Sequence, residues 1–196
     1  MAKLYFRYGA MNSGKSTLLL QTAHNYEENG MKVVIVKPKI DTKGNDKVVS
    51  RIGVEKKVDL LLEKDDNLYE IVKENYKDVS CVLVDEAQFL TKKQADECMS
   101  IVVNLEKPVI CYGLRTDFLT ESFPGSARLL AIAHSLEEMK TICGCGSKAI
   151  FVGRYVNGEF QTEGSQIAID GENKVTYKSM CPKCYGKEKM KLLIRK

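Results

Sequence analysis

The 196-residue sequence lacks any long apolar run. No segment approaches the roughly 18 consecutive apolar residues of a membrane-spanning helix, so we expect no membrane partner. Internal repeats and low-complexity blocks are also absent, which argues against repeat proteins and disordered linkers. The first expected strand begins almost at once and leaves no room for a signal or transit peptide. With 44% hydrophobic and 29% charged residues, we expect a cytoplasmic protein with a packed core.

The sequence also has little excess charge, with a formal net charge of +4. Residues 182–196 hold six Lys or Arg against one Glu, so this segment carries +5 and the other 181 residues sum to −1. Nucleic-acid-binding domains usually spread positive charge over a folded face, and this body has none, so we expect no nucleic-acid partner. The basic C-terminal segment is expected to be a solvated tail, with contact to RNA, DNA or another subunit as the alternative.

The most informative segment is residues 9–16, which read Gly-Ala-Met-Asn-Ser-Gly-Lys-Ser. They fit the phosphate-binding loop pattern Gly-x-x-x-x-Gly-Lys-[Ser/Thr], between an expected strand at 4–8 and an expected helix from 17 towards 29. Glycines let such a loop turn its N–H groups inward, and the helix N-terminus adds positive potential. We expect a bound nucleoside triphosphate, with Lys15 on the β- and γ-phosphates and Ser16 on Mg²⁺; the alternative is a chance glycine-rich turn. The loop residues concerned are Gly9, Ala10, Met11, Asn12, Ser13, Gly14, Lys15 and Ser16.

Apolar strands alternate with helices along the first part of the chain, which predicts the α/β class. Near-continuous apolar strands are typical of a parallel sheet covered on both faces, so we expect a RecA-like P-loop domain over residues 1–140. Residues 39–57 are polar and are expected to be a mobile loop. From about residue 142 helical periodicity disappears, and residues 141–196 are expected to form a small β-rich domain with the basic tail. The other expected strands are 31–38, 81–85 and 108–113, and the other expected helices are 67–76, 92–104 and 125–136.

A second nucleotide-binding signal follows the apolar run at residues 81–84, where Asp85 and Glu86 stand side by side. Ligands bind beyond the carboxyl ends of parallel strands, so Asp85 should share a crevice with the phosphate loop. Asp85 is expected to hold Mg²⁺, and Glu86 can act as general base for a nucleophile that attacks the γ-phosphate. Motif logic leaves open whether that nucleophile is water or a substrate hydroxyl, and a surface acidic pair is the plain alternative.

The seven cysteines include two close pairs separated by 35 residues. Four thiolates in two pairs suit a tetrahedral structural Zn²⁺, and redox-active or unligated thiols are the alternatives. Such a site would clamp the base of the 146–180 segment. The expected ligands are Cys143, Cys145, Cys181 and Cys184. The remaining cysteines, Cys81, Cys98 and Cys111, lie in apolar patterns and are expected to be core residues.

Taken together, these features resemble the thymidine kinase family over residues 4–185. A phosphate loop alone is generic, whereas Asp-Glu-Ala-Gln-Phe combined with the two cysteine pairs is specific. The motifs that carry the resemblance are Gly-Ala-Met-Asn-Ser-Gly-Lys-Ser at 9–16, Lys-Pro-Lys-Ile-Asp-Thr at 37–42, Asp-Glu-Ala-Gln-Phe at 85–89, Gly-Leu-Arg-Thr-Asp-Phe at 113–118, Ser-Phe-Pro-Gly at 122–125, and the four cysteines with Tyr177 before the last pair.

The resemblance implies ATP-dependent phosphorylation of the 5′-hydroxyl of thymidine or deoxyuridine, with Glu86 as catalytic base. It implies a zinc-clamped lasso loop over the nucleoside and a homotetramer. Asp41 would lie near the Mg²⁺–phosphate centre. By the same resemblance, the ATP site also includes Asp85, Glu86, Ala87 and Gln88. The nucleoside would meet Met11, Phe89, Leu114, Phe118 and Phe123, together with Tyr177, Asp170 and Gly171 from the lasso.

Two other functions compete with a nucleoside kinase. One is a nucleic-acid-dependent P-loop ATPase in which a zinc ribbon and the basic tail grip RNA or DNA. The acidic body, the short chain and the absence of a second arginine-rich helicase-like motif argue against it. The other is a nucleotide-sensing regulator without catalysis, in which Glu86 would be idle.

Overall fold

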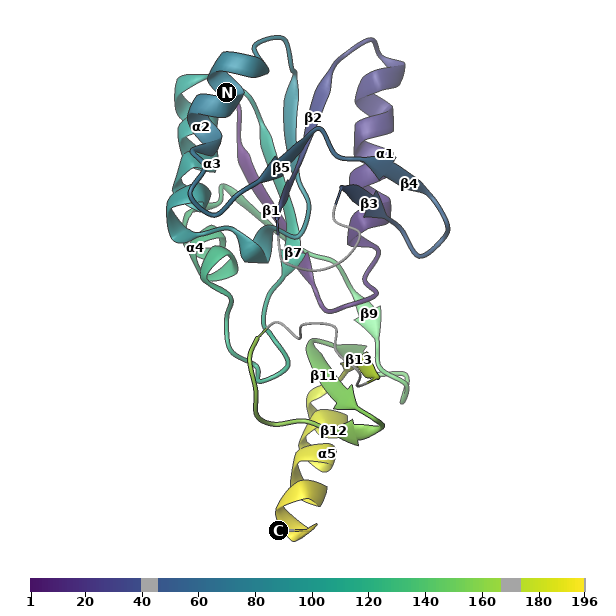
Figure 1. The fold of residues 1–196 in the computed structure, drawn as a ribbon. Helices are drawn as coiled ribbons and strands as arrows, with labels where there is room; N and C mark the ends of the chain where they lie inside the picture. Colours follow the sequence, from purple (N-terminus) through teal and green to yellow (C-terminus); the bar gives the residue numbers. More distant parts are fainter. Residues whose placement is uncertain (40–45, 167–173, 196) are drawn as a thin grey trace.

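The fold is organised around one parallel sheet, shown in Figure 1. The structure is a computed structural model that describes residues 1–39, 46–166 and 174–195; Asp41, Asp170 and Gly171 lie outside the described residues. Within these ranges the sheet has six strands in the order β5-β2-β6-β7-β1-β8, and every neighbouring pair is parallel. The strands are β1 Leu4–Gly9, β2 Val33–Pro38, β5 Leu60–Leu62, β6 Cys81–Val84, β7 Val109–Leu114 and β8 Ser135–Glu138.

Helices cover both faces of this sheet, with α1 on one side and α2, α3 and α4 on the other (Figure 1). Both faces of the sheet must be buried because the apolar side chains of each strand alternate between the two faces. In β6, Val82 and Val84 pack with the core under α2 to α4, whereas Cys81 and Leu83 pack with the core under α1. These helices are α1 Lys15–Glu28, α2 Leu68–Asn75, α3 Lys92–Asn104 and α4 Pro124–Ile132. The predicted α/β class with a parallel sheet is confirmed.

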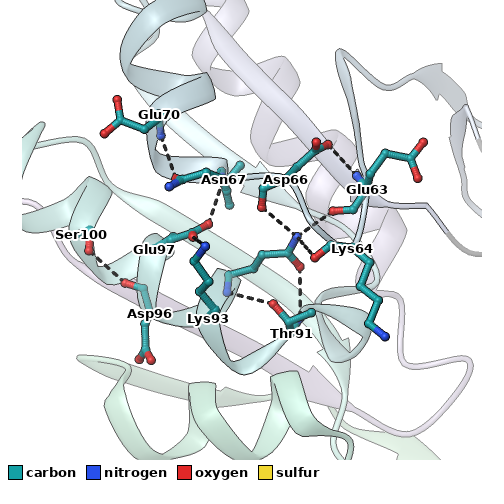
Figure 2. Close-up of polar contacts among 12 residues, drawn as sticks. Glu63, Lys64, Asp66, Asn67, Glu70, Thr91, Lys93, Asp96, Glu97 and Ser100 are labelled. Atoms are coloured by element: carbon teal, nitrogen blue, oxygen red, sulfur yellow. Dashed lines mark hydrogen bonds and ion pairs between the residues drawn. The ribbon is translucent and has the colours of Figure 1, made fainter.

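Side-chain hydrogen bonds fix α2 against α3, as Figure 2 shows. Thr91 and Gln94 form a capping box at the start of α3. The Gln94 amide also donates to the backbone carbonyls of the 63–66 turn, the closest at 2.8 Å. The Glu97 carboxylate accepts a 2.8 Å bond from the backbone N–H of Leu68, so an acid on α3 caps the positive end of α2. The turn after β5 is therefore anchored at a fixed position.

Two expectations for the main body are wrong. The 39–57 segment contains, in its described part, an antiparallel hairpin of β3 Lys47–Val49 and β4 Glu55–Lys57. The expected helix over 125–136 ends at Ile132, because Ala133 turns to an extended conformation with ψ of 140°. His134 then exchanges hydrogen bonds with Leu4, its N–H donating to the Leu4 carbonyl and its Nδ1 accepting from the Leu4 N–H. Pairing with the edge of β1 thus outweighs helix continuation and creates β8.

The C-terminal region is β-rich, as predicted, and its strands form small antiparallel sheets. It also contains a helix that the sequence analysis did not predict. The strands are β9 Thr141–Ile142, β10 Lys148–Ala149, β11 Phe151–Val156, β12 Glu159–Phe160 and β13 Val175–Met180. The basic segment taken as a tail forms helix α5 Pro182–Arg195 instead, which extends away from the main sheet (Figure 1). Pro at the first helical position favours a helix start here. The domain division after residue 140 stays a prediction.

No helix within the described part of the chain is long and apolar enough to span a bilayer.

Candidate active site

The phosphate loop joins β1 to α1 with the backbone geometry that its glycines allow. Gly14 has φ of 78° and precedes the first residue of α1. A Cβ on Gly9 would lie 2.5 Å from the Met139 carbonyl oxygen and 2.6 Å from the Ser13 hydroxyl, so no other residue fits without movement. The loop therefore keeps its N–H groups at the start of α1, where the helix dipole favours an anion.

Lys15 lies over this loop. Its Nζ donates to the Ala10 carbonyl at 2.8 Å and to the Ser13 hydroxyl at 3.3 Å. Burial lowers the pKa of Lys15, while the negative charges of Glu86 and Asp85 oppose that shift. The ammonium is thus held between the loop and the two acids, a position from which it can meet phosphate oxygens.

Asp85 and Glu86 follow β6 and have different surroundings. Asp85 is 4% exposed, and its backbone N–H donates to the Val36 carbonyl at 2.9 Å. Burial raises the pKa of Asp85 to about 7, and repulsion from Glu86 adds to the shift while Lys37 and Lys15 oppose it. Glu86 has φ of 49°, in the left-handed region, which turns its side chain away from the strand direction. Non-glycine residues rarely adopt this conformation, and those that do are concentrated at functional sites.

Gln88 fixes the Glu86 carboxylate. It lies in the short 3₁₀ helix η1 (Ala87–Phe89) and is almost fully buried. Its Nε2 donates to Glu86 Oε2 at 2.5 Å, and its Oε1 accepts from the Leu114 N–H at 3.0 Å. A Cβ on Gly113 would come within 2.9 Å of that Oε1, so the glycine at the end of β7 makes room for the amide. The carboxyl ends of β6 and β7 are therefore bridged by one side chain that orients the acid.

Lys15 and Glu86 line one cavity of about 350 Å³ at the carboxyl end of the sheet. Residues 11–16 of the phosphate loop, Thr17 and Leu114 also line it. Asp85, which the sequence predicted to share a crevice with the loop, does not line this cavity. Residues 49–52, at the end of β3 and in the turn of the β3–β4 hairpin, also line the cavity; sequence analysis took this segment for a mobile loop. The sequence indicates this hairpin only weakly, through a short β-branched run at 48–49 that is followed by Gly53.

The residues expected to bind the nucleoside lie in different parts of the structure. Met11 and Leu114 line the phosphate cavity. Phe89 and Phe123 meet edge to face with ring centroids 5.4 Å apart, and both line a second cavity of about 380 Å³ that Gln166 also borders. The structure therefore brings Phe123 against Phe89, which lies three residues after Glu86, while the roles assigned to them stay predictions.

Phe118 contacts residues of the C-terminal region and is only 2% exposed. The Arg154 guanidinium stacks on its ring at 3.5 Å from the centroid, and the Tyr185 hydroxyl donates to its carbonyl at 2.6 Å. Arg154 also donates to the carbonyls of Glu163 and Ser165 at 2.9 and 2.8 Å. Sequence analysis did not single out Arg154, because nothing in a linear pattern shows which ring an arginine covers.

Tyr177 lines a third cavity, of about 460 Å³, between the phosphate loop and the cysteines. Here the two regions are joined by hydrogen bonds to loop carbonyls. The Ser179 hydroxyl donates to the Met11 carbonyl, and the Thr141 hydroxyl donates to the Asn12 carbonyl at 3.2 Å. The C-terminal region thus holds the outer side of the phosphate loop.

The four paired cysteines converge as the spacing predicted. Their sulfur atoms all lie within 4.8 Å of one another, and the sulfurs of Cys145 and Cys181 are 3.6 Å apart. Four sulfurs about 2.3 Å from one zinc ion would lie roughly 3.8 Å apart, so the cluster fits a tetrahedral metal ion. The other three cysteines are fully buried in the main core, as expected; they are Cys81, Cys98 and Cys111.

Comparisons with known proteins agree with this geometry. The thymidine kinase family model matches residues 2–185. The chain is 48% identical to the thymidine kinase of Pasteurella multocida (strain Pm70), over 98% of this chain and 100% of that protein. It is 50% identical to the thymidine kinase of Haemophilus influenzae (strain 86-028NP), over 96% and 98%. It is 46% identical to the thymidine kinase of Enterobacteria phage T4, over 98% and 100%. The chain therefore belongs to the thymidine kinase family.

Proposed function

We propose that this protein is a thymidine kinase that transfers the γ-phosphoryl group of ATP to the 5′-hydroxyl of thymidine or deoxyuridine. The observation that carries the proposal is the Glu86 carboxylate, which shares a cavity with the phosphate loop and is oriented by Gln88. A carboxylate placed beside the transferred group suits a general base for a hydroxyl acceptor. Family membership supports the choice of nucleoside as that acceptor.

In the proposed reaction, the loop N–H groups and Lys15 bind the β- and γ-phosphates. Ser16 and Asp85 hold the Mg²⁺ that accompanies ATP. Glu86 accepts the proton of the 5′-hydroxyl while the hydroxyl oxygen bonds to the γ-phosphorus. The bond to the β-phosphate oxygen then breaks and ADP leaves. Lys15 and the helix dipole stabilise the charge on the transferred group.

We assign the nucleoside to the aromatic residues beside Glu86. Phe89 and Phe123 form a rigid aromatic corner that suits a flat pyrimidine. Met11 and Leu114 lie where the sugar end would approach the phosphate cavity. The remaining assigned residues are Phe118, Tyr177, Asp170 and Gly171, of which the last two lie outside the described residues.

The cysteine cluster is proposed to hold a structural Zn²⁺, with all four positions of the metal taken by thiolates. Bound zinc would cross-link the turn between β9 and β10 to the start of α5 without taking part in the chemistry. We also propose a cytoplasmic homotetramer that has no nucleic-acid partner.

The test is a kinase assay with purified protein, ATP, Mg²⁺ and a panel of nucleosides, in which thymidine monophosphate is the expected product. Glu86→Gln should keep ATP affinity and lose roughly two to four orders of magnitude in turnover. Glu74→Gln makes the same chemical change on the exposed face of α2 and is the matched control. ATP turnover that needs a polynucleotide would overturn the proposal in favour of the ATPase, and the absence of any nucleoside product would also overturn it.

A further inference from the structure

Two consecutive carbonyls of the phosphate loop are held from outside by hydroxyls of the C-terminal region. The Ser179 hydroxyl donates to the Met11 carbonyl, and the Thr141 hydroxyl donates to the Asn12 carbonyl at 3.2 Å. The two bonds join residues that are 168 and 129 positions apart in the chain. They fix the orientation of two adjacent peptide groups in the loop.

The orientation of these carbonyls decides where two N–H groups of the loop point. A trans peptide is planar, so its C=O and its N–H point in opposite directions. The Met11 carbonyl shares a peptide with the Asn12 N–H, and the Asn12 carbonyl shares a peptide with the Ser13 N–H. Carbonyls held against the C-terminal region therefore leave these two N–H groups directed away from it. Successive N–H groups on one side of a turn are what a loop needs to bind an anion.

The loop needs such support because Asn12 has an unfavourable backbone conformation. Its φ is 62°, in the left-handed region, which L-residues avoid although Asn tolerates it better than most. A conformation of this kind persists where the surrounding contacts determine it. The peptide before the Asn12 Cα is held by Ser179, and the peptide after it is held by Thr141. The two hydroxyls therefore secure both sides of the strained residue.

The same two hydroxyls stand beside the cysteine cluster. Thr141 lies in β9, two residues before Cys143, and Ser179 lies in β13, two residues before Cys181. Both cysteines are buried, and the sulfurs of the cluster all lie within 4.8 Å of one another. Strand β9 also contacts β13. The cluster therefore fixes the spacing between two hydroxyls that must match two successive carbonyls.

We propose that Ser179 and Thr141 are positioning residues for phosphoryl transfer, which hold the phosphate loop in the conformation that binds the triphosphate, with the cysteine cluster setting their spacing. The inference rests on the proposed kinase function, and the two side chains act through the loop backbone rather than on the reacting atoms. Ser179 should contribute more, because its hydrogen bond is partly buried, whereas that of Thr141 is exposed.

The experiment measures the KM for MgATP and, by calorimetric titration, the Kd for the non-hydrolysable analogue AMPPNP with Mg²⁺. Ser179→Ala should raise both about three- to tenfold, the usual effect of one neutral hydrogen bond, and Thr141→Val should raise both about twofold. Thr141→Ser keeps the hydroxyl and should bind AMPPNP as the wild type does. Thr176→Val is the matched control, because it removes a hydroxyl from an exposed position of β13 and should change neither constant.

A role limited to docking the C-terminal region gives a different result. In that case Ser179→Ala would lower the melting temperature and raise the KM for thymidine, while the Kd for AMPPNP would stay at the wild-type value. That outcome would overturn the proposal. A positioning role gives the opposite division, in which nucleotide affinity falls and the KM for thymidine stays within about twofold of wild type.

Cys145→Ser tests the contribution of the cysteine cluster. It should weaken AMPPNP binding in the wild-type background, and it should have much less effect in the Ser179→Ala/Thr141→Val double variant, where the hydroxyls through which it acts are gone. No weakening in the wild-type background, or equal weakening in both, would overturn the link between cluster and loop. Failure of the kinase function is detected separately, as a wild-type protein that phosphorylates no nucleoside, and the AMPPNP titrations still decide the positioning role in that case.

Discussion

Replacing Asp85 by Asn should make the nucleotide-free protein more stable while it abolishes activity. The carboxyl is 4% exposed, and burial followed by repulsion from Glu86 raises its pKa from 3.8 to about 7. One unit of pKa shift corresponds to about 1.4 kcal/mol, so the ionised carboxylate costs about 2 to 4 kcal/mol at neutral pH, allowing for its coupling to Glu86. Asn has the same shape and can still accept the hydrogen bond from the Glu86 N–H.

The sign of the pH dependence follows from the direction of that shift. Because the pKa of Asp85 is higher in the folded protein than in the unfolded chain, folding takes up a proton between pH 4 and about 7. The ionised Asp85 destabilises the fold fully at pH values above its folded-state pKa. This destabilisation disappears as the pH falls towards the pKa of Asp85 in the unfolded chain. The difference between Asp85→Asn and wild type should therefore be largest at pH 8 and should shrink towards pH 5.

Thermal melting at pH 5.5, 7 and 8, without Mg²⁺ or nucleotide, measures this difference. For a chain of this size about 1 kcal/mol shifts Tm by roughly 2 to 4 °C, so Asp85→Asn should melt at least about 4 °C above wild type at pH 8. Asp65→Asn, on the exposed turn after β5, is the matched control and should leave Tm unchanged. An Asp85→Asn protein that melts at or below the wild-type temperature at pH 8 would refute the reasoning.

Three further substitutions test the supports of the site. Gly113→Ala places a Cβ within 2.9 Å of Gln88 Oε1, so kcat should fall at least about tenfold while the KM for MgATP stays the same, as steady-state kinetics would show. Arg154→Ala uncovers the Phe118 ring and removes two hydrogen bonds to backbone carbonyls, so the KM for thymidine should rise about tenfold. An unchanged KM would contradict this. Cys145→Ser removes one of four sulfurs, so elemental analysis should find less than one zinc per chain, and the variant should melt at a lower temperature than the wild type. A variant with one zinc per chain and the wild-type melting temperature would argue against the metal site.

The features that the sequence predicted correctly are those encoded within a few consecutive residues. The phosphate loop carries its own glycines and its lysine, and β6 is a run of apolar residues that ends in two acids. The cysteine pairs were predicted to converge because four thiols in two close pairs suit one metal ion. In each case the local pattern already contains the chemistry, so no knowledge of distant partners was needed.

The features that were missed depend on partners far away in the chain. Strand β8 is polar, and Leu136 is 48% exposed, so only its pairing with β1 makes it a strand. The β3–β4 hairpin buries only Val48 of its apolar residues, since Val49, Ile52 and Val54 are exposed. Its turn lines the same cavity as a loop about 40 residues earlier. The role of Gln88 is set by a hydrogen bond to Leu114, 26 residues away. Periodicity cannot show such contacts, because they are properties of the assembled sheet edge.

The two adjacent acids illustrate how a local motif and its tertiary setting divide the chemistry between them. The sequence pattern assigns Mg²⁺ to Asp85 and the proton to Glu86, although both are carboxylates at adjacent positions. In the fold, Asp85 continues the buried end of β6, where a carboxylate is costly until a cation neutralises it. Glu86 occupies a left-handed backbone position and is held by Gln88 at the wall of the phosphate cavity. The buried acid is therefore suited to Mg²⁺, and the oriented acid at the cavity is suited to take the proton of the acceptor.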